Sequence, residues 1–174
     1  GVAVCTERGF HVAPWINEMI AAGHTSFYRN ENGVRLCYNP ETKQYEALPG
    51  QETRISLAYL AESSVVWKNS GTTIQDIGDG ILNIAFHTKM NSIGSEVIEG
   101  LNKVIDLAED GTKWRGVVVS NEGANFSAGA NVGMIFMLAV EQEWDDLDFA
   151  VRAFQNAMMR MRYSGVPVVA APHQ

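Results

Sequence analysis

The strongest structural pattern in the chain is an apolar stripe at helical spacing between residues 95 and 108. Its members are Val97, Ile98, Leu101, Val104, Ile105 and Ala108. The i, i+3, i+4, i+7 spacing predicts an amphipathic helix, and Ser95 and Glu96 are residue types that favour a helix N-terminus. The segments before and after this stripe have the pattern of β-strands, so the stripe predicts a helix that alternates with strands.

Four strand-like runs and two further helical patterns surround this helix. The predicted strands cover residues 73–77, 81–86, 116–120 and 166–171, and the further predicted helices cover 131–140 and 144–163. The turn Gly78-Asp79-Gly80 favours a hairpin between the first two strands. The last two strands are short apolar runs of the kind that is buried on both faces. From Thr72 onward the sequence therefore predicts an α/β fold.

The residues before this α/β region predict a smaller, different segment. Pro14 and Gly23 bracket a short helical pattern, as expected for a helix start and a helix end. Residues 34–38 and 44–48 alternate around a polar turn and predict a β-hairpin, and residues 55–61 predict another short helix. We expect a first region of residues 1–70, ending in a connector, and a second region of residues 71–174.

A loop of small residues follows the predicted strand at 116–120 and leads into a helix. Ala128, Gly129 and Ala130 offer almost no side-chain bulk, so a ligand oxygen could approach the backbone N–H groups at the helix N-terminus. The loop could bind an oxyanion. For loops of small residues in general, an ordinary turn between a strand and a helix is the commoner interpretation, and spacing alone does not decide between the two.

Two motifs, which follow each other along the chain in the order typical of the family, resemble the enoyl-CoA hydratase/isomerase, or crotonase, superfamily. They are Phe126-Ser-Ala-Gly-Ala-Asn131 after a Val-Val-Val strand, and Lys89-Met-Asn-Ser-Ile93 ahead of the amphipathic helix. The resemblance covers Thr72 to Gln174 and implies the first half of a crotonase-like ββα spiral. The family usually has aspartate at the position of Asn131.

The resemblance implies roles for particular residues. The backbone N–H of Ala130 would be one of two oxyanion donors to the thioester oxygen of a coenzyme A substrate. Coenzyme A would be held by the turn Lys89-Met90-Asn91 and by the main chain at Ala128 and Gly129. The second donor and the hydratase glutamates of the family would follow Gln174, so we expect the chain by itself to show no hydratase turnover.

Residues 13–28 resemble the closing stretch of the dehydrogenase region in long bacterial 3-hydroxyacyl-CoA dehydrogenases. The resemblance implies a fused fatty-acid β-oxidation enzyme with NAD bound in the dehydrogenase region. No Gly-x-Gly-x-x-Gly motif follows a strand here, so the nicotinamide site is not expected in this chain. The chain begins with Gly1 and not with methionine, which suggests a processed or cut chain.

Two other functions remain open at this point. The second region could be a non-catalytic crotonase-like module that binds acyl-CoA or a partner protein, or it could serve another reaction of the superfamily, such as double-bond isomerisation. The residues beyond Gln174 would discriminate between these functions.

Composition limits the partners and the compartment. The net charge of −7 argues against nucleic acid and anionic membrane surfaces. No apolar run approaches the roughly 20 residues of a membrane span, and the N-terminus lacks signal-peptide features. Cys5 and Cys37 have no disulfide or metal spacing, which fits the reducing cytoplasm. We expect a homo-oligomer, since the strand at 166–171 offers an exposed edge.

Several chemically suggestive residues are better explained by structure. The four histidines lack metal-ligand spacing, and the acidic residues between 141 and 148 suit helix capping and solvation. Met158, Met159 and Met161 fit core packing better than an acyl-chain lining. Ser127 is not surrounded by a nucleophile elbow, so a structural role is expected.

Overall fold

The computed structural model describes residues 1–31, 34–50, 55–57, 60, 62–111 and 113–173. The chain divides into two compact units, Gly1–Leu60 and Ala61–Gln174. This division falls before the predicted boundary at 70/71, because strand β4 (Val65–Lys68) pairs with strand β5 (Thr72–Asp76) of the second unit. The predicted helix at 55–61 lies partly outside the described residues.

In its described residues, the first unit contains two α-helices and a three-stranded antiparallel sheet. Its elements are α1 (Val2–Glu7), α2 (Pro14–Ala21), β1 (Tyr28–Glu31), β2 (Val34–Asn39) and β3 (Gln44–Ala47), with the strand order β1-β2-β3. The predicted helix and the β2–β3 hairpin are confirmed. Strand β1 was not predicted, because its sequence is mostly polar and all four residues are exposed.

Aromatic rings form the packed centre of this first unit. Met19 and Tyr38 are its buried apolar residues. The ring of Tyr38 stacks on Trp15 at 6.4 Å between centroids and meets Tyr45 edge-on at 5.5 Å, and the ring of His24 lies 5.6 Å from Tyr38. Rings in these offset and edge-on arrangements attract one another. A small aromatic cluster therefore replaces an aliphatic core.

The second unit is built on a five-stranded sheet with the order β4-β5-β6-β7-β8. The remaining strands are β6 (Ile81–Phe86), β7 (Gly116–Val119) and β8 (Val168–Ala170). Strands β4, β5 and β6 are antiparallel neighbours, whereas β6, β7 and β8 are parallel. The predicted β5–β6 hairpin and the strands β7 and β8 are confirmed, and β4 is an addition.

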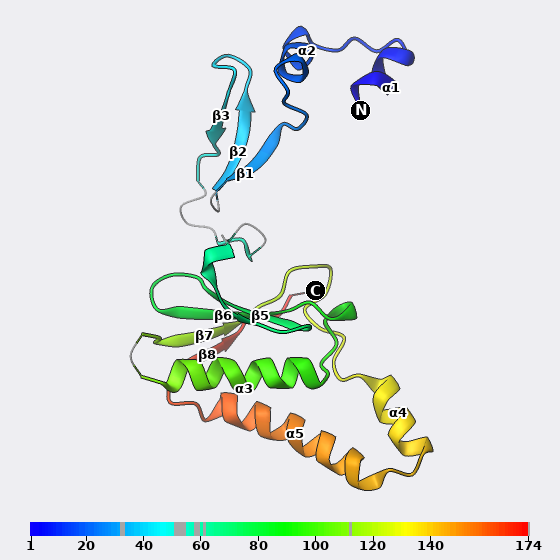
Figure 1. Ribbon diagram of the computed structural model, residues 1–174, viewed down its shortest axis with the longest axis vertical. Helices are drawn as coiled ribbons and strands as arrows, with labels where there is room; N and C mark the ends of the chain where they lie inside the picture. Colours follow the sequence, from blue (N-terminus) through cyan, green and yellow to red (C-terminus); the bar gives the residue numbers. More distant parts are fainter. Residues whose placement is uncertain (32–33, 51–54, 58–59, 61, 112, 174) are drawn as a thin grey trace. The chain divides into compact units, whose positions relative to one another are not determined.

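Two helical layers cover one face of this sheet. Helix α3 (Ser95–Glu109) lies between the sheet and α5 (Trp144–Arg162), as Figure 1 shows. Helix α4 (Val132–Val140) precedes α5 and contacts it. Arg160 of α5 forms an ion pair with Asp106 of α3, which ties the two helical layers together. The predicted α/β class is confirmed.

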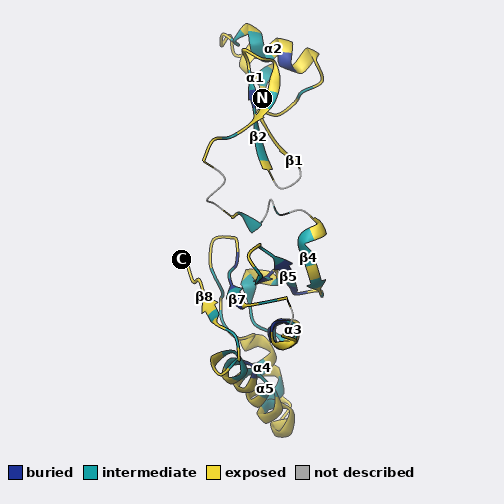
Figure 2. Cartoon of the chain, turned by 90° about the vertical axis from the view of Figure 1, so that its left-hand side faces the viewer, coloured by how far each residue is buried: buried dark blue, intermediate teal, exposed yellow. Residues whose placement is uncertain are grey.

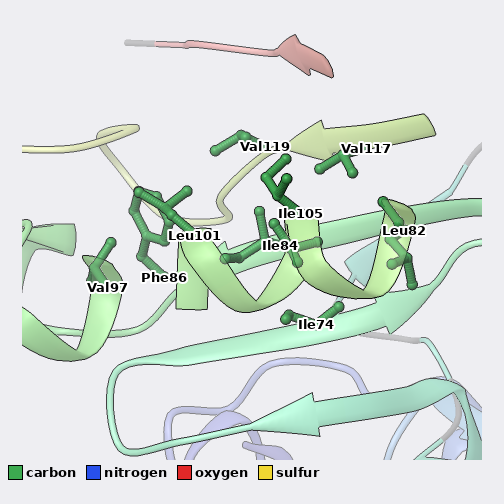
Figure 3. Close-up of a cluster of buried hydrophobic side chains, with 11 residues drawn as sticks. Ile74, Leu82, Ile84, Phe86, Val97, Leu101, Ile105, Val117 and Val119 are labelled. Carbon is green, nitrogen blue, oxygen red and sulfur yellow. The ribbon is translucent and has the colours of Figure 1, made fainter. Parts of the chain in front are cut away.

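The core lies between α3 and the sheet. Figure 3 shows Val97, Leu101 and Ile105 of α3 among the buried side chains of β5, β6 and β7. Of the predicted apolar stripe only Ile98 remains partly exposed. Complete burial of an aliphatic side chain contributes roughly 1.5–3 kcal/mol relative to exposure. The stripe therefore fixes both the position of α3 and the face that it presents to the sheet.

The prediction that strand β8 is buried on both faces is wrong. Val168 is half-buried, whereas Val169 is 56% exposed. Strand β8 stands at the edge of the sheet and pairs only with β7 among the described strands. Figure 2 shows this strand, together with much of α4 and α5, in the colours of exposed and half-buried residues.

Candidate functional site

Two segments that are distant in the sequence meet at one end of the sheet. The turn Lys89–Asn91 follows β6, and the loop of residues 120–131 follows β7. Because β6 and β7 are parallel, their carboxyl ends lie at the same edge of the sheet. The two segments named by the resemblance are therefore neighbours.

Hydrogen bonds join the turn to the loop. The Asn91 side-chain amide donates to the Asn125 carbonyl at 3.1 Å, and the Ser127 hydroxyl donates to the Asn91 carbonyl at 2.6 Å. The Ala128 amide donates to the Met90 carbonyl at 3.1 Å. The predicted structural role of Ser127 is thereby explained, because its hydroxyl is engaged in bracing the loop.

A short parallel bridge fixes the peptide unit that carries the Ala130 amide. The Ile93 amide donates to the Gly129 carbonyl at 2.8 Å, and the Asn131 amide donates to the Ile93 carbonyl at 3.2 Å. In a trans peptide the C=O and the following N–H point in opposite directions. Since the Gly129 carbonyl points toward Ile93, the Ala130 N–H points away from it.

The Ala130 amide has no hydrogen-bond acceptor within the part of the chain that the structure describes. Ala130 is exposed, and it lines a cavity of about 720 Å³. An amide left without a protein partner can donate to a ligand. The arrangement can therefore offer one preorganised N–H to a ligand oxygen beside Ala130.

The cavity lies between the first half of α3, α4 and α5, and it is largely apolar. Its apolar walls include Ile98, Met134, Ile135, Leu138, Phe149 and Phe154. Sequence reasoning missed this cavity, because the three helices that form it are brought together only by folding. The composition of α4 contained a signal, since all nine residues of Val-Gly-Met-Ile-Phe-Met-Leu-Ala-Val are apolar or glycine and none is buried.

Asn131 occupies the N-cap position of α4. Its side-chain oxygen accepts a hydrogen bond from the Met134 amide at 3.3 Å. An N-cap of this kind satisfies one of the free N–H groups in the first helical turn. The neutral amide therefore performs the capping role of an aspartate without adding a negative charge beside the Ala130 amide.

The five residues that the resemblance links to coenzyme A are at least partly accessible. Lys89 and Ala128 are exposed, Met90 is 64% exposed, and Asn91 and Gly129 are half-buried. Met90, Asn91 and Gly129 all have positive φ angles, of 57°, 51° and 84°. The structure therefore brings all six candidate residues together around one exposed edge.

The suggestive residues set aside from the sequence have structural explanations. Asp145 and Asp146 lie in the first turn of α5, and Asp148 forms an ion pair with Arg152 one turn later. Met158 and Met161 pack against the core. These observations confirm helix-terminus and packing roles for them. Met159 is different, because its side chain is 48% exposed.

Carboxyl groups with clearly perturbed pKa values lie outside the cavity. The Gly78 amide lowers the pKa of Asp76, with a contribution from Lys113, and the Gly165 amide and the Ser164 hydroxyl lower the pKa of Glu109. Both carboxylates brace turns. Among the described residues no helix is long and apolar enough to cross a membrane, and no group of His, Cys, Asp and Glu side chains could hold a metal ion.

The chain is similar in sequence to a bacterial dehydrogenase and to a bacterial fatty acid oxidation protein. No family model matches the chain. Over 167 residues, 95% of its length, it is 39% identical to a probable 3-hydroxyacyl-CoA dehydrogenase of Bacillus subtilis. Over 128 residues it is 25% identical to a Rickettsia felis protein described as a fatty acid oxidation complex trifunctional enzyme. The chain spans only 21% and 17% of these two relatives.

Solved enoyl-CoA hydratases share the fold. The chain aligns with the enzyme from Polaromonas sp. JS666 at a TM-score of 0.54 and 23% identity, covering 59% of this chain and 40% of that one. The Bacillus halodurans enzyme aligns at 0.54 and 19% identity, covering 59% and 42%. At this identity the likeness shows the fold.

The mixed α/β architecture is part of the crotonase fold, which confirms the predicted fold resemblance. The sequence is similar to those of a bacterial 3-hydroxyacyl-CoA dehydrogenase and of fatty-acid oxidation proteins, which confirms the predicted likeness to such proteins.

Proposed function

We propose that the unit Ala61–Gln174 binds acyl-CoA thioesters and directs the Ala130 N–H at the thioester oxygen, as part of a fatty-acid β-oxidation enzyme. The observation that carries this proposal is an accessible amide without a hydrogen-bond partner among the described residues, at the wall of a large apolar cavity. Reactions at an acyl thioester place enolate charge on this oxygen, and a preorganised donor stabilises that charge.

The apolar cavity suits the acyl group. Its volume of about 720 Å³ lies within the range of small-molecule sites, which is roughly 300–1,000 Å³. The side chains of Ile135, Leu138 and Phe154 line it. An acyl chain placed there would leave water and contact these side chains, while its thioester oxygen remained beside Ala130.

The exposed turn and loop suit the coenzyme A moiety. The chain as a whole carries a net charge of −7, so phosphate groups need a local cation. The exposed Lys89 offers one at this edge. Met90, Asn91, Ala128 and Gly129 lie at the same edge, where hydrogen bonds join the turn to the loop. The loop turns at Gly129 through a positive φ angle, which glycine adopts without strain because it has no Cβ.

We expect binding by this chain without the turnover of a complete hydratase. Oxyanion stabilisation normally needs two donors, and removal of one costs on the order of a hundred- to a thousand-fold in rate. Ala130 is the one donor assigned among the described residues. The unit Gly1–Leu60 is proposed as the end of a dehydrogenase region whose NAD site lies elsewhere, and the cytoplasm is the expected compartment.

Titration calorimetry of the full chain with coenzyme A and with crotonyl-CoA tests the proposal. Ala130→Pro removes the N–H, whereas Ala130→Gly retains it and is the matched control. We expect the proline variant to bind crotonyl-CoA about fivefold more weakly, as for the loss of one hydrogen bond. Its affinity for coenzyme A should stay within about twofold, and the glycine variant should resemble the wild type.

Two outcomes would contradict the proposed function. The wild-type chain could fail to bind crotonyl-CoA, or the proline variant could bind it as tightly as the wild type does. Hydration of crotonyl-CoA by the 174-residue chain at the rate of an intact hydratase would contradict the expected lack of turnover.

A further inference from the structure

The turn Lys89–Asn91 has an unusual backbone. Met90 and Asn91 are consecutive non-glycine residues with φ angles of 57° and 51°. The left-handed region is unfavourable for residues with a Cβ, and each such residue persists only where its surroundings hold it. The Asn91 amide donates to the Thr88 carbonyl at 3.0 Å, which closes the turn. Asparagine adopts this region more readily than most residues, so Met90 is the residue whose conformation the surroundings must hold.

The left-handed turn directs two successive carbonyl groups at the loop. The Met90 carbonyl accepts from the Ala128 amide, and the Asn91 carbonyl accepts from the Ser127 hydroxyl. The Asn91 side chain adds a third bond to the Asn125 carbonyl. The strained residues are thus those whose carbonyls hold the loop.

Ser127 continues this bracing toward Ala130. Its oxygen also accepts a hydrogen bond from the Gly129 amide at 3.0 Å. The Gly129 carbonyl in turn accepts from Ile93, and this carbonyl belongs to the same peptide unit as the Ala130 N–H. Hydrogen bonds therefore run from the left-handed turn through Ser127 to the Gly129 amide, and the peptide unit that carries the Ala130 N–H is the next one along the chain.

We infer that Asn91 and Ser127 are positioning residues that set the direction of the Ala130 N–H toward the thioester oxygen. This inference rests on the proposed function. The two residues do not touch the reacting atoms, and they act through the Gly129–Ala130 peptide. Without the Ser127 hydroxyl, the Gly129 amide loses its partner, and the adjoining Gly129–Ala130 peptide keeps only the bond from the Ile93 amide among the described residues. This peptide then reorients more freely, which lowers the time that the Ala130 N–H spends aimed at the ligand.

The test measures polarisation of the bound carbonyl as well as affinity. Crotonyl-CoA labelled with ¹³C at the carbonyl is bound to the full chain, and its ¹³C chemical shift is compared with that of the free ligand. In Ser127→Ala we expect about half or less of the bound displacement to remain and affinity for crotonyl-CoA to fall about fivefold, with the affinity for coenzyme A within about twofold of wild type. Ser127→Thr, which keeps the hydroxyl, should restore most of the displacement.

Asn91→Gly supplies a second variant that does not threaten the fold. Glycine adopts the left-handed conformation readily, so only the bond to Asn125 is lost. We expect a change in the same direction as for Ser127→Ala. A merely structural role would not alter the carbonyl shift of the ligand that remains bound.

Ser164 provides a matched control. It also donates to another segment, at 3.0 Å to Glu109, and accepts from the amide two residues later, at 3.3 Å from Val166. Ser164→Ala should leave the carbonyl shift at the wild-type value. If the ¹³C shift is unchanged in both Ser127→Ala and Asn91→Gly, the inference is overturned and the proposed function is not. The same holds if Ser164→Ala loses as much of the bound displacement as Ser127→Ala does. Absence of wild-type binding overturns the proposed function, and the inference with it.

Discussion

Asn131 is the residue at which the candidate site departs from the family pattern, because aspartate is usual there. The structure shows that the asparagine caps α4 through the Met134 amide. A carboxylate would cap the helix and interact with the positive end of the helix dipole, but it would also stand beside the Ala130 amide. If Ala130 donates to an oxyanion as proposed, helix stability favours a carboxylate at this position and ligand binding disfavours it.

Asn131→Asp should change helix stability and ligand binding in opposite directions. We expect the free energy of unfolding to rise by about 0.5 kcal/mol, because an anion favours a helix N-terminus, and crotonyl-CoA binding to weaken. Asn131→Ala is the control that removes the cap and should cost about 1 kcal/mol. Urea denaturation and calorimetry measure the two effects. Tighter binding by the aspartate variant would contradict the expected opposition.

Other single-residue features were accessible to sequence reasoning only in part. The resemblance named Ala130 and the turn, and the structure places them together. The resemblance did not reveal the hydrogen bond between the Ser127 hydroxyl and the Asn91 carbonyl, because these residues are 36 positions apart. Hydrogen bonds over such separations depend on the pairing of β6 with β7, which residue types alone do not specify.

At the scale of elements, α3 illustrates how closely a helix can approach a sheet. Gly100 lies on its buried face, and a Cβ added there would be only 2.9 Å from the Cβ of Thr72 on β5. Thr72 is itself fully buried, so it has little room to move away. Close packing of this kind makes even one additional methyl group costly.

Gly100→Ala should therefore destabilise the second unit by about 2 kcal/mol, although alanine is the better helix former. Gly133 of α4 is a matched control, since a Cβ there meets only the Asn131 side-chain oxygen at 3.4 Å. We expect Gly133→Ala to be neutral or stabilising by up to about 1 kcal/mol. Urea unfolding followed by circular dichroism would show the difference, and equal effects of both substitutions would argue against the close contact.

Elements with strong periodicity were predicted well, and weak ones were not. Helix α3 and the β5–β6 hairpin follow directly from spacing and turn residues. Strand β4 was missed because its four residues, Val-Val-Trp-Lys, gain strand structure by pairing with β5. The same is true of β1, which is held by pairing with β2.

At the scale of the whole molecule, β8 presents an edge that pairs with no further strand among the described residues. Val169 is 56% exposed on this strand. Exposed edges bearing apolar side chains favour pairing with another chain. A dimer or larger oligomer remains our prediction, to be measured by light scattering at micromolar concentration.

Val169→Lys should shift the chain toward the monomer, because a charge on an edge strand opposes edge-to-edge pairing. Val140→Lys at the end of α4 is a suitable control, since Val140 is 59% exposed and lies outside the sheet. A monomeric wild type would contradict the prediction. An equal effect of both substitutions would indicate association through general apolar surface instead.

The sequence by itself determined the class of fold, the order of its main elements and the loop of small residues, because these depend on spacing and on local backbone preference. It also carried the likeness to crotonases and to 3-hydroxyacyl-CoA dehydrogenases. Only the tertiary structure decided that the turn Lys89–Asn91 braces the loop and that the Ala130 N–H has no acceptor within the described chain. It also decided that α3, α4 and α5 line an open cavity that Ala130 borders. The reason is physical: the direction of one peptide unit and the volume left between helices are set by contacts among segments that lie far apart in the sequence.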